Sequence, residues 1–323
     1  MGKILFSKDI YDFFKEKEYQ IVKPSNVVNN TDTVFYSAGI QPLLSGFING
    51  DIRESRKLFI AQPVIRTQYL DSLDEGTSLA FINGTTSCFN LSERDYEKLV
   101  RDWIEFFCQI GLEEKKITTM HDYYEDTWDN ISLAGKRTFY YYDNLEIGDT
   151  TFFGQVSGDR IGTMCDLGFG IERLRWCLES GSYYNLYSDS SVLNPKVKAL
   201  LSAMSLLFVC NVAPSNKNSG YRARLFSKKL AEVLQARKLN EMELNYLKEC
   251  IKYWSDWQQV ESNNDNSMII NEYSRNCKAI IKNQLINEGY SVNRIDINIP
   301  WDDFEKRLRS AGVSKEKIKS MIG

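Results

Sequence analysis

The stretch from Cys165 to Leu174 holds a carboxylate, two glycines and an arginine in a short space. Its order, Cys-Asp-Leu-Gly-Phe-Gly-Ile-Glu-Arg-Leu, predicts a strand, a Gly-x-Gly turn and the start of a helix. Gly168 and Gly170 have no side chain, so the backbone can approach a flat ligand closely. Arg173, in the first helical turn, can stack on a base or pair with a phosphate. The alternative is a simple tight turn before a helix.

Several other chemistries are excluded by residue type and spacing. The stretch is not a dinucleotide-binding fingerprint, because Arg173 stands where the third glycine of Gly-x-Gly-x-x-Gly belongs. The chain has one histidine, His121, which rules out multi-histidine metal sites; its acidic neighbours favour an exposed structural role. Seven cysteines without Cys-x-x-Cys spacing predict free, mostly buried thiols.

The composition is that of a soluble protein of roughly two domains, with 323 residues, 43% hydrophobic and 26% charged. No apolar run reaches the roughly 20 residues that a membrane-spanning helix needs. Met1 to Ser7 lacks the pattern of a signal peptide. We therefore expect a cytoplasmic protein with no membrane contact.

The charge is distributed unevenly along the chain. The net charge is −10 for residues 1–190, +6 for residues 191–260 and +1 for residues 261–323. A basic segment joined to an acidic body is typical of a surface that binds a polyanion such as nucleic acid. A lysine-rich helix face exposed to solvent is the alternative.

The first part of the chain predicts a mixed domain with an antiparallel sheet. A short helix begins with Ser7 as N-cap, and an extended run follows at residues 33–37. A longer helix follows Ser92, whose partner in an approximate capping box is Asp95, and ends at Gly111. Three later segments have strand composition: Lys116–Tyr124, Thr138–Tyr142 and Thr150–Phe153. Helices do not alternate with these strands, which favours antiparallel pairing.

The second part of the chain predicts mainly helices. Their ranges are Val197–Val209, Tyr221–Arg237, Asn240–Gln258 and Trp301–Arg309. Residues 261–267 read as a polar loop. The change of pattern places two domains at residues 1–190 and 191–323.

The Cys165–Leu174 stretch resembles motif 3 of the class II aminoacyl-tRNA synthetases, in the version of the alanyl-tRNA synthetases. Further resemblances follow in the family's order: Phe35–Ile40 with Gly46-Phe47 (motif 1), Ala61–Arg66 (motif 2), Asp126–Trp128, Glu146–Phe152, Tyr184–Asp189 and Pro214–Arg224. The set covers residues 1 to about 237. It implies an α+β fold, with an antiparallel class II catalytic domain followed by tRNA-recognition helices up to about residue 260.

The resemblance assigns an ATP site. Arg66 would bridge the carboxylate of the amino acid and the α-phosphate of ATP, a task for which a bidentate guanidinium suits two anions. Arg173 would lie over the adenine or beside the triphosphate, with Phe81 on the other face of the base and Gly168 and Gly170 beneath it. ATP and Mg²⁺ are the implied cofactors, and no residue is assigned as a metal ligand. A surface arginine after an apolar strand is the alternative for Arg66.

The resemblance also assigns a pocket for a small amino acid. Asp166 would hold the α-ammonium, because a buried carboxylate needs a compensating cation. Trp128 would wall the side-chain pocket, with ordinary core packing as its alternative. Thr151 would lie against the side chain of the substrate, where its hydroxyl could favour serine, although alanine is the first choice.

The second domain carries the implied tRNA contacts. Asn216 occupies the position of an asparagine that helps the family read a guanine–uracil pair in the acceptor stem, with a turn residue as the alternative. Four cations would meet phosphates of the duplex: Arg222, Arg224, Lys228 and Lys229. The family's second reader, an aspartate, has no counterpart in this sequence.

The expected function is activation of a small amino acid by ATP as an aminoacyl adenylate and its transfer to a tRNA acceptor stem, as in an alanine–tRNA ligase. The family's His-His-Thr-Phe-Phe-Glu continuation of motif 2 is missing, and no editing or C-terminal domain is recognisable, so hydrolysis of mischarged product is not expected. Two alternatives stay open. One is transfer to a carrier protein, peptide or metabolite, and the other is a non-catalytic tRNA-binding paralogue.

Overall fold

The computed structural model describes residues 7–29, 33–49, 56–73, 78–128, 131–156, 162–179, 193–261 and 265–322. The chain forms two compact units. The first contains Met1–Thr67 and Ala80–Leu186, and the second contains Gln68–Leu79 and Tyr187–Gly323. Gln68–Leu79 therefore groups with the helices of the second unit. The sequence-based domain boundary at residue 190 stays a prediction.

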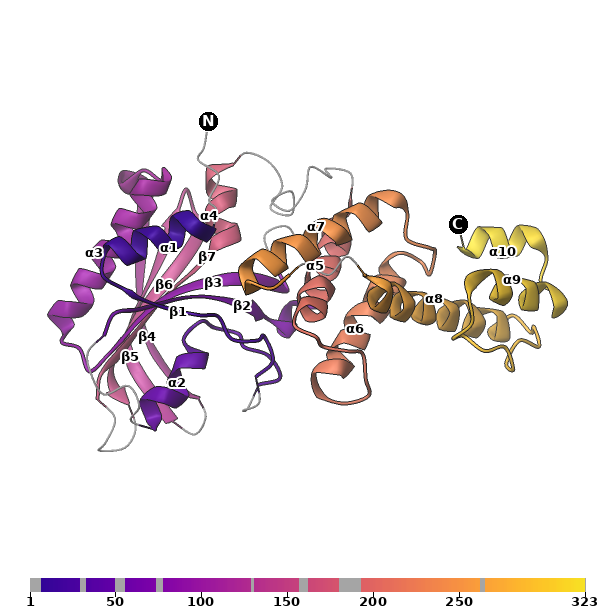
Figure 1. Ribbon diagram of the computed structural model, residues 1–323, viewed down its shortest axis with the longest axis horizontal. Helices are drawn as coiled ribbons and strands as arrows, with labels where there is room; N and C mark the ends of the chain where they lie inside the picture. The colour runs from indigo at the N-terminus through magenta and orange to yellow at the C-terminus, as the bar shows by residue number, and fades with distance from the viewer. Residues whose placement is uncertain are drawn as a thin grey trace. The chain divides into compact units, whose positions relative to one another are not determined.

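The first unit is built on a seven-stranded sheet in the order β1-β2-β3-β7-β6-β5-β4 (Figure 1). The strands are β1 Gln20–Val22, β2 Leu58–Ile65, β3 Ala80–Phe89, β4 Ile117–Trp128, β5 Ile131–Tyr142, β6 Leu145–Val156 and β7 Met164–Gly170. All neighbouring strands pair antiparallel except β1 and β2, which pair parallel. The predicted α+β class and antiparallel sheet are confirmed, with one parallel pair at the edge.

One face of the sheet is covered by helices α1 (Ser7–Glu16) and α3 (Glu93–Ile110) (Figure 1). Its core is aromatic. Phe169 of β7 lies 5.3 Å from Phe106 and 5.8 Å from Trp103, measured between ring centroids. These fully buried rings hold the far side of β7 in place. That side faces away from the residues of the candidate site.

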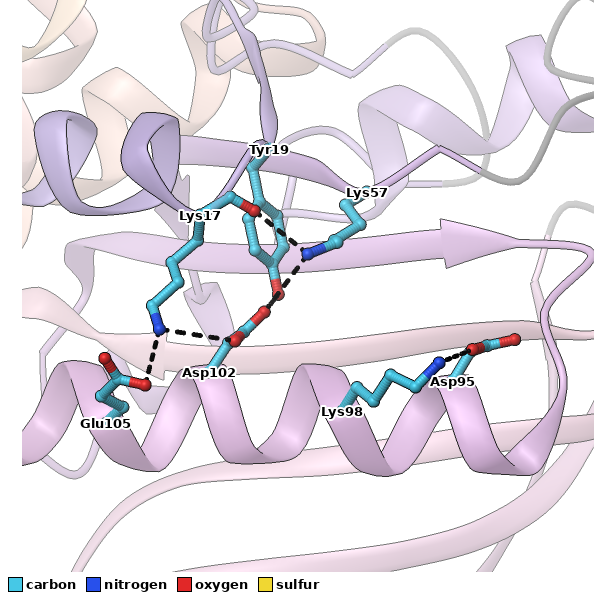
Figure 2. Close-up of polar contacts among 7 residues, drawn as sticks. All are labelled: Lys17, Tyr19, Lys57, Asp95, Lys98, Asp102 and Glu105. Atoms are coloured by element: carbon cyan, nitrogen blue, oxygen red, sulfur yellow. Dashed lines mark hydrogen bonds and ion pairs between the residues drawn. The ribbon is translucent and has the colours of Figure 1, made fainter.

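A polar cluster joins α1, β1 and the start of β2 to α3 (Figure 2). Lys17 Nζ lies 2.6 Å from Glu105 and 3.9 Å from Asp102. The hydroxyl of Tyr19 donates to Asp102 at 3.1 Å, and Lys57 donates to the carbonyl of Lys17 at 3.0 Å. Because Lys17 and Glu105 are partly exposed, their ion pairs contribute little to stability, and the cluster mainly fixes how α1 lies against α3.

The helix and strand predictions for this unit are largely confirmed. Helix α3 begins after Ser92, whose hydroxyl accepts a hydrogen bond from the Asp95 N–H, and Gly111 ends it with a φ of 115°. All three predicted strands exist and extend further than predicted. Helix α1 begins at Ser7, whose side chain lies outside the described residues, so its capping role is not described.

Two local predictions were wrong. Residues 33–37 do not form a strand; they contribute a single β-bridge between Val28 and Phe35. The Gly-x-Gly segment is not a turn, because β7 continues through Gly170 and helix α4 (Ile171–Leu178) follows at once. Both glycines are therefore strand residues whose backbone forms part of the sheet surface.

The second unit is helical in the part that the structure describes. Its helices are α5 Pro195–Val209, α6 Asn218–Val233, α7 Glu241–Gln258, α8 Ser267–Asn287, α9 Trp301–Ser310 and α10 Lys315–Ile322. The predicted capping box of Asn240 and Glu243 is present at the start of α7. Buried Glu243 also pairs with Arg237, which ties the helix start to the preceding turn. Helix α8 was not predicted from the sequence.

Candidate active site

Strand register places several polar side chains on the sheet face opposite α1 and α3. Asp166 on β7 is paired with Thr151 on β6 and with Ser87 on β3, and paired residues of antiparallel strands share a face. One step further along, Gly168 is paired with Asp149 and with Thr85. We call the set Asp149, Thr151, Asp166, Ser87 and Thr85 the polar face.

Asp166 and Ser87 present acceptor atoms that lack a donor. Asp166 Oδ1 and Ser87 Oγ are hidden from solvent, and neither has a hydrogen-bond partner among the residues that the structure describes. Ser87 as a whole is 0% exposed. Burial, and to a smaller extent the neighbouring Asp149, raises the pKa of Asp166 well above its usual value. Arg66 opposes this shift but has a smaller effect. The pair therefore favours a ligand that brings a positive charge and N–H donors. Ser87 was not identified from the sequence.

Asp149 is a second carboxylate on the polar face that sequence reasoning missed. Burial and the nearby Glu146 raise the pKa of Asp149 to about 6, against smaller opposite effects of Arg137 and Arg66. Its side chain is half-buried and makes no hydrogen bond or ion pair within the described part of the chain. The sequence does contain a signal for Asp149. Glu146–Phe152 resembles a strand of the family's catalytic domain, and Asp149 lies in it two residues before the predicted site residue Thr151.

Replacing Asp149 with asparagine is expected to stabilise the protein at pH 8 and to have little effect at pH 4. The pKa of about 6 in the folded state exceeds the usual value of 3.8. The folded state therefore binds the proton more tightly, and stability falls as the pH rises from about 4 through 6. The gain in free energy of unfolding is at most about 3 kcal/mol at pH 8. Urea denaturation of both proteins at the two pH values measures it, and an equal difference at both would contradict the assignment.

Arg66 and Phe81 lie together at one end of the polar face. Val64 on β2 is paired with Phe81 on β3, and Arg66 follows Val64 by two positions, so the two side chains share the face. The guanidinium carbon of Arg66 lies 4.8 Å from the centre of the Phe81 ring. Arg66 Nε also donates to the carbonyl of Ser37 at 3.2 Å. The stacked pair offers a flat cationic surface with its remaining N–H groups available for anions.

Gly170 lies beside both Phe81 and the start of the Arg173 side chain. A Cβ on Gly170 would lie 3.6 Å from Cβ of Arg173 and 3.8 Å from Phe81. Both carboxylate oxygens of Glu172 accept from the Ile82 N–H, at 3.0 and 2.9 Å, which fixes the start of α4 against β3. Arg173 itself donates to the carbonyl of Glu146 at 3.1 Å. The Arg173 guanidinium is therefore held at β6, while Gly170 adjoins the ring of Phe81.

The turn at Ser37–Gly39 lies directly on the sheet. The Gly39 N–H donates to Asn83 Oδ1 at 2.6 Å, and the Asn83 amide donates to the Phe169 carbonyl at 3.3 Å. A Cβ on Gly39 would come within 2.3 Å of Thr85 Oγ1, so only glycine fits. Asn83 therefore holds the motif 1 segment over β3 and β7, a role that was not anticipated.

We expect Gly39→Ala to lower the free energy of unfolding by about 2 kcal/mol, because the added methyl overlaps Thr85 and Asn83 on a central strand. Chemical denaturation measures the loss. Gly154→Ala is the matched control, since its Cβ would meet Phe152 at 3.7 Å, an ordinary contact. Equal stability of the two variants would contradict the close approach of the turn.

Trp128 packs in the apolar cluster beside the polar face. Its ring lies 5.9 Å from both Tyr124 and Phe153, and Phe153 follows Thr151 by two positions on the same strand face. The cluster also includes helix α2 (Gln41–Ile48). The observed contacts of Trp128 are therefore those of core packing, the alternative given for it in the sequence analysis. Its role as a pocket wall next to Thr151 stays a prediction.

Comparison with known proteins finds distant relatives of one kind. No protein-family model matches the chain. An alanine–tRNA ligase of Methanococcus maripaludis strain C5 is 22% identical, over 98% of this chain and 44% of the relative. The ligase of strain C6 is 28% identical over 56% of this chain and 22% of the relative. The chain thus spans less than half the length of these relatives.

The relatives and the antiparallel sheet agree with the ordered motifs. The chain has an alanyl-tRNA synthetase-like class II core. Among solved structures, a pyrrolysyl-tRNA synthetase of Desulfitobacterium hafniense matches 52% of this chain and 64% of its own, with a TM-score of 0.38 and 13% identity. That likeness is too distant to add to the assignment.

The expected tRNA-binding residues of this synthetase-like chain lie in and just before α6. Arg222 and Lys229 are about two turns apart on one stripe, and Arg224 and Lys228 are about one turn apart on another. Arg224 donates to Asn216 and pairs with Glu272 at 3.5 Å. Lys228 and Lys229 pair with Glu232 and Asp71 at 3.8 and 3.0 Å. The structure therefore separates the four cations into two groups.

The remaining predictions concern metals, thiols and membranes. Within the described ranges, no three or more His, Cys, Asp or Glu side chains come together as a metal site. All seven cysteines are free and five are buried, as predicted. His121 is exposed, and its Nδ1 lies 3.0 Å from Thr138 Oγ1, in line with a structural role. None of the helices in the described part has the length and apolar character needed to cross a membrane. The matched segment Tyr184–Asp189 lies outside the described residues.

Proposed function

We propose that this chain activates a small amino acid with ATP to form an aminoacyl adenylate and transfers the aminoacyl group to a tRNA, in the cytoplasm. The observation that carries the proposal is the polar face. Arg66 and Phe81 lie at one end of it, and beside them Asp166 Oδ1 and Ser87 Oγ are buried without a hydrogen-bond partner among the described residues. An amino acid has both a carboxylate for Arg66 and an ammonium for Asp166. Alanine is the first candidate, by likeness to the relatives.

Activation joins two anions, so it needs fixed cations. A carboxylate oxygen of the amino acid attacks the α-phosphorus of ATP, a new P–O bond forms, and the bond to the bridging oxygen of pyrophosphate breaks. Arg66 would offset the negative charge that collects between these groups, and Asp166 with Ser87 would hold the ammonium so that the carboxylate points at phosphorus. A tRNA ribose hydroxyl then attacks the carbonyl carbon, and AMP leaves.

The adenosine of ATP would lie on the surface formed by Phe81, Gly168, Gly170 and Arg173. At Gly168 a Cβ would meet the Asn83 amide at 3.3 Å, so the glycine lets the Asn83 side chain lie close to β7. Mg²⁺ would arrive bound to phosphate oxygens of ATP and would offset part of the charge of the triphosphate. We assign no protein ligand to it.

Amino-acid-dependent exchange of pyrophosphate into ATP tests the proposal. A panel of single amino acids with the purified chain should give exchange with at least one small amino acid. Absence of exchange with every amino acid would reject the enzymatic proposal and favour the non-catalytic, tRNA-binding alternative.

We assign the acceptor to tRNA because residues 191–260, which contain α6 and the turn at Asn216, have a net charge of +6 and so favour a polyanion. Arg224 is already engaged by Asn216 and Glu272, so the stripe of Arg222 and Lys229 is the better candidate for phosphate contact. In the described part of the chain, Lys229 pairs with highly exposed Asp71, a contact that a phosphate can replace.

The double variant Arg222→Ala/Lys229→Ala is expected to weaken tRNA binding and to reduce the slope of log K against log salt by roughly two, about one per lost phosphate contact. Filter binding at several salt concentrations measures the slope. Lys248→Ala/Lys252→Ala on exposed positions of α7 is the control. Equal slopes in both variants would move the acceptor away from this surface and favour a carrier protein, peptide or metabolite.

A further inference from the structure

The polar face holds one more carboxylate than the proposed reaction with alanine requires. Asp166 Oδ1 and Ser87 Oγ already provide acceptors for an α-ammonium, since both are hidden and lack donors within the described residues. Asp149 lies on the neighbouring strand, level with Gly168, and points to the same side of the sheet. It therefore faces the space that the substrate would occupy, with no ammonium assigned to it.

The nearby cations do not neutralise Asp149. Arg137 is committed to Asp122, which it contacts at 2.6 Å, and its guanidinium lies over the ring of Phe139 at 4.4 Å. Arg66 makes no ion pair with Asp149 among the described residues, and its proposed task is to offset the reactants. Among the residues that the structure describes, no cation pairs with Asp149, a condition that favours a cationic ligand.

Strand geometry places the two carboxylates within reach of one small ligand. Diagonal neighbours on adjacent antiparallel strands, as Asp149 and Asp166 are, lie about 7–8 Å apart. A charge-assisted hydrogen bond from an ammonium to a carboxylate spans about 2.8 Å. Two ammonium groups that lie between the carboxylates and bind one each can therefore be as close as about 2 Å. A diamino acid with only two or three carbons between its nitrogens can thus reach both carboxylates.

We propose that Asp149 binds a second ammonium on the side chain of the substrate, so that this chain selects a short diamino acid, such as 2,3-diaminopropionate or 2,4-diaminobutyrate, over alanine. The inference rests on the proposed activation reaction and specifies its substrate class. Thr151 follows Asp149 by two positions on β6 and is paired with Asp166 on β7. Its hydroxyl provides a further acceptor for the side-chain ammonium, which alanine would leave unused.

Pyrophosphate exchange with alanine, serine, lysine and the two diamino acids tests the proposal. In the wild-type chain, kcat/KM for a short diamino acid should exceed that for alanine at least tenfold. Asp149→Asn, which keeps the shape and removes the charge, should abolish this preference. Asp143→Asn is the matched control: Asp143 is an exposed carboxylate in the turn between β5 and β6, at a φ of 47° that asparagine tolerates, and the preference should be unchanged.

Three results would overturn the proposal or the function beneath it. Preference for alanine or serine in the wild type, unchanged in Asp149→Asn, would overturn the diamino-acid assignment and leave activation intact. Thermal stabilisation by diaminopropionate in the wild type but not in Asp149→Asn, without exchange, would support the ligand class and reject activation. Neither exchange nor stabilisation would reject both. Circular dichroism of each variant confirms that the comparison is between folded proteins.

Discussion

Replacing Arg66 with alanine is expected to lower amino-acid-dependent pyrophosphate exchange by at least about 100-fold while leaving the fold intact. Its guanidinium lies 4.8 Å from the centre of the Phe81 ring and lowers the pKa of both Asp149 and Asp166. Removing it would leave two reacting anions without a fixed positive charge between them. The fold should persist, because within the described residues the contacts of Arg66 are a hydrogen bond to Ser37 and the ring of Phe81, both at the surface of the sheet.

Two further variants make the Arg66 result specific. Arg66→Lys keeps the charge but loses the bidentate fork, so its exchange should fall between those of the wild type and of Arg66→Ala. Arg101→Ala, at an exposed position on α3 across the sheet, should leave exchange unchanged. Near-normal exchange in Arg66→Ala would remove the arginine from the reaction.

Replacing Asp166 with asparagine is expected to stabilise the free protein at pH 8 and to weaken the activation of every amino acid. Burial raises the pKa of Asp166 well above its usual value, so its charged form costs stability as the pH rises above the usual range of a carboxyl group. Asparagine removes that cost. It also removes the counter-charge for the α-ammonium, so KM for the amino acid should rise at least about tenfold, with a smaller change in KM for ATP.

The combination of the two effects separates a binding role from a structural one. A carboxylate that only supported the fold would destabilise the protein when neutralised. Urea denaturation and exchange kinetics on the same preparation give both readings. Loss of stability together with unchanged KM for the amino acid would show that Asp166 does not face the substrate.

The elements with complete local signals were predictable from the sequence. Helix α3 has a capping residue directly before its first residue, Ser92, and another directly after its last, Gly111. Helix α7 has the capping box of Asn240 and Glu243. Helix α8 also has a signal that was overlooked. Its residues Ile269, Tyr273, Cys277, Ile281 and Leu285 are buried and recur every four positions. The asparagines and charged residues between them hide the stripe, because they make the segment polar as a whole.

The candidate site could be predicted only in part. Arg66, Phe81 and Arg173 followed from ordered motifs. The structure places Arg66 over the ring of Phe81, and Gly170 lies beside both Phe81 and Arg173. Ser87 and Asp149 were missed, because their relevance depends on strand register, which pairs residues far apart in sequence. No local pattern encodes that β3 lies between β2 and β7.

A crystal structure with a non-hydrolysable sulfamoyl analogue of alanyl adenylate tests the central claim most directly. The account predicts the sulfamoyl group about 3 Å from Arg66, the ammonium about 3 Å from Asp166, and the adenine against Phe81 and Arg173. An analogue bound away from these side chains, or one bound with its ammonium turned from Asp166, would contradict it.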